Sequence, residues 1–228
     1  MARQAAAEAA APARRGLSPP EGASALAARL WRRRLRRSFF ARDALDAAPA
    51  LVGTYLVVGS PAHVRIARVV ETEAYRGPSD AACHARVGLT RRTRTLFGPP
   101  GHAYVFLIYG MYDCFNVVCM AEGAGHAVLV RAVEPVAGLA QGARGDGPGR
   151  LTRALGLRRS DDGRPVDEPE LFFAAPRPAE AQALCVATSA RVNVAYAGAV
   201  AEEPWRFFDG QSSSVSKVPR RSLGLGRG

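Results

Sequence analysis

The sequence predicts a single compact α+β domain in which helices flank a β core. The chain has 228 residues, 48% of them apolar, which is enough for one well-packed domain. Strand-like apolar runs fill the middle of the chain, at residues 55–59, 64–75, 103–108, 114–120 and 127–133. Helical patterns precede and follow them, at residues 25–37 and 148–157. No internal repeat is present, so we expect one domain over residues 26–209.

The segments around this core are predicted in turn from their composition. The 25–37 helix is predicted to have a basic face, formed by Arg29, Arg32, Arg33, Arg34, Arg36 and Arg37. A run of solvated charges is the alternative explanation. Residues 43–56 begin as a helix that is expected to break at Pro49. A polar connection follows at residues 161–170, and residues 189–196 and 205–208 are predicted as two late strand-like pieces.

The two ends of the chain differ from the domain in composition. Residues 1–25 are rich in Ala, Pro and Arg, and so few large apolar side chains cannot offset the entropy of ordering. An organelle transit peptide is the weaker interpretation, because Glu8 and Glu21 are acidic. We expect a disordered tail over residues 1–25 and a flexible Ser- and Arg-rich tail over residues 210–228.

The charge of the chain indicates a polyanionic partner. The formal net charge is +11, and Lys217 is the single lysine among 31 basic residues. Basic surface attracts phosphates whatever their sequence, so nucleic acid is the first candidate, although charge alone does not separate DNA from RNA or from an anionic membrane surface. The longest apolar runs contain Pro or Gly and are too short for a membrane span. We therefore expect a soluble, cytoplasmic protein.

The cysteines do not indicate a metal site. Cys83, Cys114, Cys119 and Cys185 form no CxxC pair and have no second cluster of ligands nearby in the sequence. We expect four reduced thiols and no bound metal.

Two acidic side chains share one face of the predicted strand 64–75. Alternation along a strand puts Glu71, Glu73 and Tyr75 on the same side. Taken alone, two glutamates on a strand more often face water than take part in catalysis. The long Gly-, Pro- and Arg-rich loop at residues 76–101 changes this balance, because it returns His84 shortly after a tight turn. A carboxylate, a phenol and an imidazole are thus predicted to line one pocket.

A second unit is a hairpin whose turn has an unusual composition. Two apolar runs flank the sequence YGMY at residues 109–112, so aromatic and Met side chains stand where polar turn residues are usual. Such a tip suits a wedge between base steps of a duplex. A hairpin folded back on its own core explains the pattern equally well.

Together these residues resemble a known family, the alkyladenine (3-methyladenine) DNA glycosylases of bacteria and animals. The resemblance includes ETEAY at 71–75, Gly77-Pro78 with Asp80, and His84. It continues through YGMY at 109–112, Asn116, Arg131-Ala132, Gly147-Pro148 and Arg206-Phe207, and so runs from about residue 41 to residue 208. It implies a curved antiparallel β core with flanking helices and a protruding hairpin, similar to the C-terminal domain of methionyl-tRNA formyltransferase.

The resemblance also implies a role for each matched residue. Glu73 would deprotonate the attacking water, which Arg131 would help to hold. Tyr75, His84 and Phe106 would sandwich the flipped base, and the animal members carry a tyrosine in place of Phe106. Asn116 would exclude normal guanine. Tyr109 would fill the gap that the flipped nucleotide leaves in the duplex, with Met111 beside it.

The chemistry agrees with these roles. Breaking an N-glycosidic bond builds positive charge on the sugar, so one carboxylate can stabilise that charge and activate water. Alkylated purines are electron-poor, and aromatic rings recognise them without a full hydrogen-bond code. The only lysine lies in the C-terminal tail, so a Schiff-base lyase step is not expected. We expect a monofunctional enzyme that needs no cofactor.

The expected partner is double-stranded DNA containing alkylated or deaminated purines. We expect a bacterial, nucleoid-associated monomer that starts base excision repair at 3-methyladenine and 7-methylguanine, with hypoxanthine and ethenoadenine as further candidates. A non-catalytic nucleic-acid-binding module is the alternative, because the implied fold also serves that purpose and the chain is basic. Base release from alkylated DNA separates the two.

Overall fold

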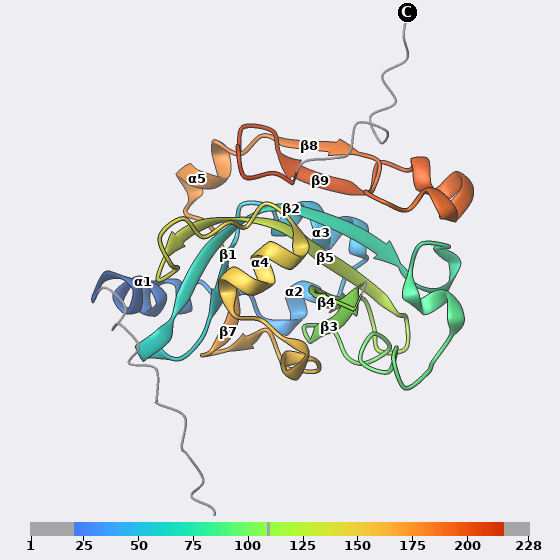
Figure 1. The fold of residues 1–228 in the computed structure, drawn as a ribbon, viewed down its shortest axis with the longest axis horizontal. Helices are drawn as coiled ribbons and strands as arrows, with labels where there is room; N and C mark the ends of the chain where they lie inside the picture. Colours follow the sequence, from blue (N-terminus) through green and yellow to red (C-terminus); the bar gives the residue numbers. More distant parts are fainter. Residues whose placement is uncertain (1–20, 109, 217–228) are drawn as a thin grey trace, which may run out of the picture.

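A curled antiparallel sheet of nine strands organises the fold in the computed structural model, which describes residues 21–108 and 110–216 (Figure 1). The strands are β1 (Tyr55–Val58), β2 (Arg65–Arg76), β3 (Ala103–Ile108), β4 (Tyr112–Cys119), β5 (His126–Ala137), β6 (Asp167–Glu168), β7 (Leu171–Ala174), β8 (Val186–Ser189) and β9 (Arg206–Asp209). The helices are α1 (Glu21–Trp31), α2 (Arg37–Phe40), α3 (Ala44–Leu51), α4 (Pro148–Leu155) and α5 (Pro178–Gln182). Short 3₁₀ turns are η1 (Pro61–His63), η2 (Gly77–Ser79), η3 (His84–Val87), η4 (Arg159–Asp161) and η5 (Ala195–Glu202).

Strand β2 is the central strand of the sheet. The order is β3-β4-β5-β2-β1-β7-β6, and β9 joins β2 and β8. The first residues of β2 pair with β1, and residues 71–73 pair with β9, while β5 runs along its other side. Residues 71–73 therefore have a neighbouring strand on both sides, and their backbone is shielded from water. The predicted α+β domain with a curved antiparallel core is confirmed.

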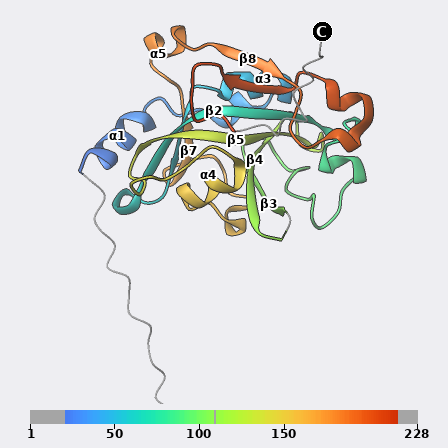
Figure 2. The ribbon, with the colours of Figure 1, turned by 45° about the horizontal axis from the view of Figure 1, so that its top comes forward.

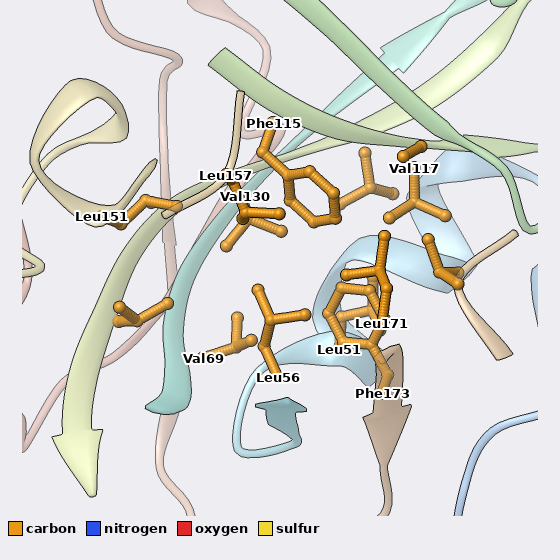
Figure 3. Packing of buried hydrophobic residues seen from close by; sticks show 14 of the residues in the cluster. Leu51, Leu56, Val69, Phe115, Val117, Val130, Leu151, Leu157, Leu171 and Phe173 are labelled. Atoms are coloured by element: carbon orange, nitrogen blue, oxygen red, sulfur yellow. The ribbon is translucent and has the colours of Figure 1, made fainter. Parts of the chain in front are cut away.

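The main hydrophobic core fills the space between the curled sheet and helices α3 and α4. Its members come from both helices and from six strands, and Leu51, Leu151, Phe115 and Phe173 are fully buried. Figure 3 shows these side chains meeting with Val130 and Leu171 in one cluster. Because helix and strand side chains interlock here, the core holds the sheet in its curled shape.

Two adjacent bulges decide which face of the sheet carries the acidic side chains. The pairing of β2 with β5 shifts register between Val69 and Glu71 and again between Glu71 and Thr72, which leaves Val70 and Arg131 without opposite partners. Ahead of the bulge Ala67 and Val69 join the main core, and beyond it Ala74 does. Since one extra residue reverses the alternation of a strand, Glu71, Glu73 and Tyr75 point away from this core. The shared face predicted for them is confirmed.

Helices α3 and α4 begin and end at recognisable signals. The Asp43 carboxylate caps α3 by accepting the Leu45 N–H at 2.9 Å. Pro148 occupies the first turn of α4, and Gly156 ends it in the left-handed conformation at φ 75°. The predicted break at Pro49 is wrong, because α3 continues to Leu51. Pro49 lies in the last turn of this short helix, and because it has no N–H, the Leu45 carbonyl receives no i+4 hydrogen bond.

Three predicted boundaries change. The basic helix ends at Trp31, not at residue 37, and a turn and α2 follow it. Residues 21–25 belong to α1, where Ala23 is buried and the Ser24 hydroxyl donates to the Pro61 carbonyl at 2.6 Å. At the other end, residues 210–216 are placed against the domain and Ser216 is buried. The remaining tail residues, 1–20 and 217–228, lie outside the described residues.

Two further properties concern the described part of the chain. No helix within residues 21–108 and 110–216 has the length and apolar character required to cross a bilayer. All four cysteines are free thiols, and burial raises the pKa of Cys83 and Cys114 to about 11.

Removing a core side chain tests this packing. Leu151→Ala on α4 is expected to lower the free energy of unfolding by about 2–5 kcal/mol, because a fully buried leucine leaves a cavity between helix and sheet. Urea denaturation followed by circular dichroism measures the change. Leu89→Ala is the control, since that leucine is exposed and its loss is expected to cost less than about 0.5 kcal/mol. Equal losses in both variants would contradict the described core.

Candidate active site

Glu73 is a fully buried carboxylate held by donors from three parts of the chain. Its Oε1 accepts the Val192 N–H at 2.7 Å, and its Oε2 accepts the Tyr75 hydroxyl at 2.9 Å. Arg131 Nη1 is 3.4 Å from Oε2. Burial, followed by the charge of Glu73, raises the pKa of Tyr75 well above its usual range, so the phenol keeps its proton and donates it to Glu73. The carboxylate is therefore ordered before any ligand arrives.

Glu71 lies beside it and pairs with two guanidinium groups. Glu71 Oε1 accepts from Arg131 Nε at 2.9 Å and from Arg206 Nε at 2.7 Å, and the Ser216 N–H donates to Oε2 at 2.6 Å. Burial alone would raise the pKa of the Glu71 carboxyl, but Arg131, Arg206 and the Ser216 N–H hold it below its usual range. Two carboxylates and two guanidiniums thus form a buried cluster with zero net charge.

A second buried ion pair fixes the loop after β2 against the segment before η5. Arg191 donates to both oxygens of Asp80, at 2.6 and 2.9 Å, and neither side chain is exposed. Asp80 also accepts the backbone N–H groups of Arg76 and Ala82. Figures 1 and 2 show the two segments together at the end of the molecule opposite α1. This pair sets the position of the neighbouring Val192 N–H.

The strand expected at residues 189–196 is wrong, because this segment binds Asp80 and Glu73 and does not pair as a strand. Strand β8 ends at Ser189, and Asn193 adopts the left-handed conformation at φ 61°. The Arg191 side chain and the Val192 N–H are directed to Asp80 and Glu73. Their hydrogen bonds therefore complete the site and do not extend a strand ladder.

A cavity of about 810 Å³ opens beside this buried cluster. It is built from β2, the loop containing His84, the β3–β4 hairpin, β5, the start of α4 and the segment before η5. Its lining side chains include Tyr75, His84, Tyr104, Phe106, Tyr112, Asn116, Leu129, Arg131, Val192 and Tyr196. Glu73 lies behind Tyr75, Arg131 and Val192. A volume of this size accommodates a nucleotide.

His84 faces the cavity as a neutral ring. It begins η3, and its Nδ1 lies 3.0 Å from the Tyr104 hydroxyl. Its ring centroid is 4.4 Å from that of Phe106, at 63°. Burial, and then the charges of Arg92 and Arg86, lower the pKa of the His84 imidazole to about 4. At neutral pH this wall of the cavity is aromatic and uncharged.

Asn116 lines the cavity from strand β4. It is buried, and its Nδ2 donates to the backbone carbonyls of Tyr104 at 3.1 Å and Cys114 at 3.5 Å. These bonds hold the amide in one orientation. Glu73, Tyr75, His84, Phe106, Asn116 and Arg131, six of the predicted site residues, are thus brought together at one cavity.

The predicted hairpin is present, and its described tip is exposed. β3 and β4 pair from Ala103 opposite Val117 to Ile108 opposite Tyr112, and Met111 is 69% exposed. Tyr109 lies outside the described residues. The loop bearing His84 carries four exposed arginines, Arg86, Arg91, Arg92 and Arg94, and Arg92 reaches the cavity rim.

Several contributors were not predicted from the sequence. Asp80 and Arg206 were matched in the resemblance without a role, and Arg191, the Val192 N–H and Ser216 were not singled out. Arg191 is separated from Asp80 by 111 residues, so no local pattern joins them. Ser216 stands in a Ser-rich segment whose composition is typical of a tail.

A buried carboxylate lies beside a cavity with aromatic walls and a basic rim, an arrangement typical of enzymes that bind a planar group. Residues 38–213 match the methylpurine-DNA glycosylase (MPG) family. A protein from Myxococcus xanthus is 53% identical over 185 residues, covering 81% of this chain and 94% of its own length. One from Anaeromyxobacter dehalogenans strain 2CP-1 is 50% identical over 188 residues, covering 82% of this chain and 87% of its own.

A third relative, from Legionella pneumophila strain Corby, is 41% identical over 187 residues, covering 82% of this chain and all of its own length. All three are named for 3-methyladenine DNA glycosylase activity. The chain belongs to the methylpurine-DNA glycosylase family. It is a DNA glycosylase, a hydrolase of DNA base excision repair, which sets aside the non-catalytic binding module.

The neutrality of His84 can be tested by titration. The ring is expected to stay uncharged from pH 8 to about pH 5, with an apparent pKa of about 4 in histidine NMR spectra. In urea the same ring should titrate near 6.5. Because the unfolded chain then binds the proton first, His84 should make stability fall as pH decreases from 6.5 to about 4. A folded-state pKa near 6.5 would contradict the described burial.

Proposed function

We propose that this glycosylase takes an alkylated purine out of duplex DNA and hydrolyses its bond to deoxyribose. The proposed substrates are 3-methyladenine and 7-methylguanine, with hypoxanthine and ethenoadenine as further candidates. The observation that carries the proposal is the ordered, fully buried Glu73 carboxylate beside a cavity of about 810 Å³ that the rings of Tyr75, His84 and Phe106 line. We further propose that it acts as a monomer on chromosomal DNA.

Glu73 is proposed as the general base, with Arg131 as the residue that holds the attacking water. The water oxygen bonds to the sugar C1′ as the C1′–N bond breaks, and the water proton passes to Glu73. The electron pair of the broken bond returns to the base, which neutralises a cationic alkylpurine. While positive charge builds on the sugar, the buried carboxylate stabilises it at short range. Arg131 and Tyr75 keep Glu73 oriented throughout.

Recognition of the base is proposed to depend on Tyr75, His84 and Phe106. Ring stacking favours an electron-poor, cationic base. Since the pKa of His84 is lowered to about 4, the imidazole adds no positive charge that would repel such a base. Phe106 supplies a ring face without a hydroxyl. Asn116, held by two backbone carbonyls, is proposed to crowd the exocyclic amine of normal guanine.

Contact with the duplex is proposed to come from the hairpin tip and the arginine-rich loop. Met111 is exposed at the tip, and the adjacent Tyr109, on its position in the sequence, is proposed to fill the gap left by the flipped nucleotide. The four exposed arginines of the loop would bind phosphates near the cavity. No lysine lines the described cavity, so we propose hydrolysis without a lyase step.

The Glu73→Gln variant tests the general base. It is expected to lose at least about a thousandfold in single-turnover excision while binding lesion duplex nearly as well as wild type, because the amide keeps the shape but cannot take the proton. Release of free base from alkylated duplex measures excision, and fluorescence anisotropy measures binding to the lesion duplex. Glu202→Gln, an exposed glutamate of η5, is the matched control. Near wild-type excision by Glu73→Gln would exclude Glu73 as the base.

The Tyr109→Ser variant tests the proposed wedge. Flipping costs a few kcal/mol of stacking and pairing, and an inserted ring recovers part of this. The variant should bind a paired lesion more weakly and excise it more slowly, with a smaller defect when the same lesion sits in a bulge. Single-turnover excision in both contexts measures this. An equal defect in both would show that Tyr109 supports the fold or the pocket instead.

A further inference from the structure

The chain beyond β9 returns to the buried charge cluster, which it contacts through Ser216, the last residue of the described range. The Gly210 N–H donates to the Cys185 carbonyl at 2.9 Å, and the Ser212 N–H to the Asp209 carbonyl at 3.1 Å. These bonds tie the segment to β8 and β9. Four residues later Ser216 is buried against Glu71, although the family match ends at residue 213.

Every polar group of Ser216 contacts the cluster. Its N–H donates to Glu71 Oε2 at 2.6 Å, and its hydroxyl donates to Glu71 Oε1 at 2.8 Å. Its Oγ also accepts from Arg131 Nη2 at 3.4 Å, and its carbonyl oxygen accepts from Arg206 Nη2 at 3.5 Å. Ser216 is therefore joined to Glu71, Arg131 and Arg206 at once.

Arg131 stands between the two carboxylates and is closer to Glu71. Its Nε is 2.9 Å from Glu71 Oε1 and 3.4 Å from Glu73 Oε1, and its Nη1 is 3.4 Å from Glu73 Oε2. A guanidinium drawn onto Glu73 would neutralise the carboxylate and make it a weaker base and a weaker stabiliser of a cation.

We propose that Ser216 is a positioning residue of the active site, which holds Glu71 and Arg131 together and so keeps Glu73 reactive. The inference rests on the proposed function of Glu73. Ser216 fixes both oxygens of Glu71 and supplies the acceptor for Arg131 Nη2. Without that hydroxyl, Arg131 Nη2 loses its acceptor in the cluster, and the guanidinium can turn further toward Glu73, whose Oε2 is already 3.4 Å from Nη1. The C-terminal segment thereby contributes to catalysis without touching the substrate.

The test is Ser216→Ala in the full chain, with Ser213→Ala as the matched control because Ser213 is exposed in the same segment. Loss of one charge-assisted hydrogen bond should lower the single-turnover excision rate constant about tenfold. The affinity for lesion duplex, measured in a Glu73→Gln background, should stay within about twofold. Ser216→Thr keeps the hydroxyl and should recover most of the rate. The rate constant, unlike the amplitude, does not depend on how much of the sample is folded.

A second readout is independent of activity. In spectra of ¹⁵N-arginine-labelled protein, the Arg131 Nε–H resonance should shift in Ser216→Ala and stay in place in Ser213→Ala. An unchanged excision rate in Ser216→Ala, or a loss of rate matched by an equal loss of lesion affinity, would overturn the proposal, as would an unmoved resonance. Wild-type protein that releases no base from alkylated DNA would instead refute the proposed substrates, and the resonance would still report on Ser216.

Discussion

The structure depends on one electrostatic constraint, the burial of two carboxylates in the middle of a sheet. Glu71 and Glu73 are both fully buried, and an isolated ionised carboxylate at such a position would cost several kcal/mol. Arg131 and Arg206 supply the two positive charges that balance them. The cluster therefore requires β2, β5 and β9 to be neighbours, which is the arrangement of the sheet at this point.

The two carboxylates belong to one buried cluster but accept hydrogen bonds from different groups. Glu71 accepts four hydrogen bonds, from two guanidinium groups and from the backbone and hydroxyl of Ser216, and its pKa is lowered. Glu73 is held more loosely by Arg131 and bonds directly to residues that line the cavity, Tyr75, Arg131 and Val192. Glu71 thus anchors the two cations, and Glu73 is the carboxylate that we propose as the general base.

Much of this arrangement was predictable, because it depends on local patterns. The alternation of residues 71–75 predicted the shared face of Glu71, Glu73 and Tyr75, and the apolar runs around residues 109–112 predicted the hairpin. The matched motifs predicted the family, which the comparisons confirm. The alternation held for residues 71–75 only because they lie beyond the bulge at Val70. Counted from Val69, the same rule would have placed Glu71 and Glu73 in the hydrophobic core.

The sequence by itself determined the fold class, the family and the acidic, aromatic and basic residues available to the site, since strand period, turn composition and motifs are short-range properties. The tertiary structure alone decided how those residues are held. Arg191 meets Asp80 across 111 positions and Ser216 meets Glu71 across 145, and both contacts exist because folding removes these charges and their partners from water together. The local composition around Ser216 indicated a tail, whereas in the folded chain Ser216 is buried and donates to the Glu71 carboxylate, which water does not reach.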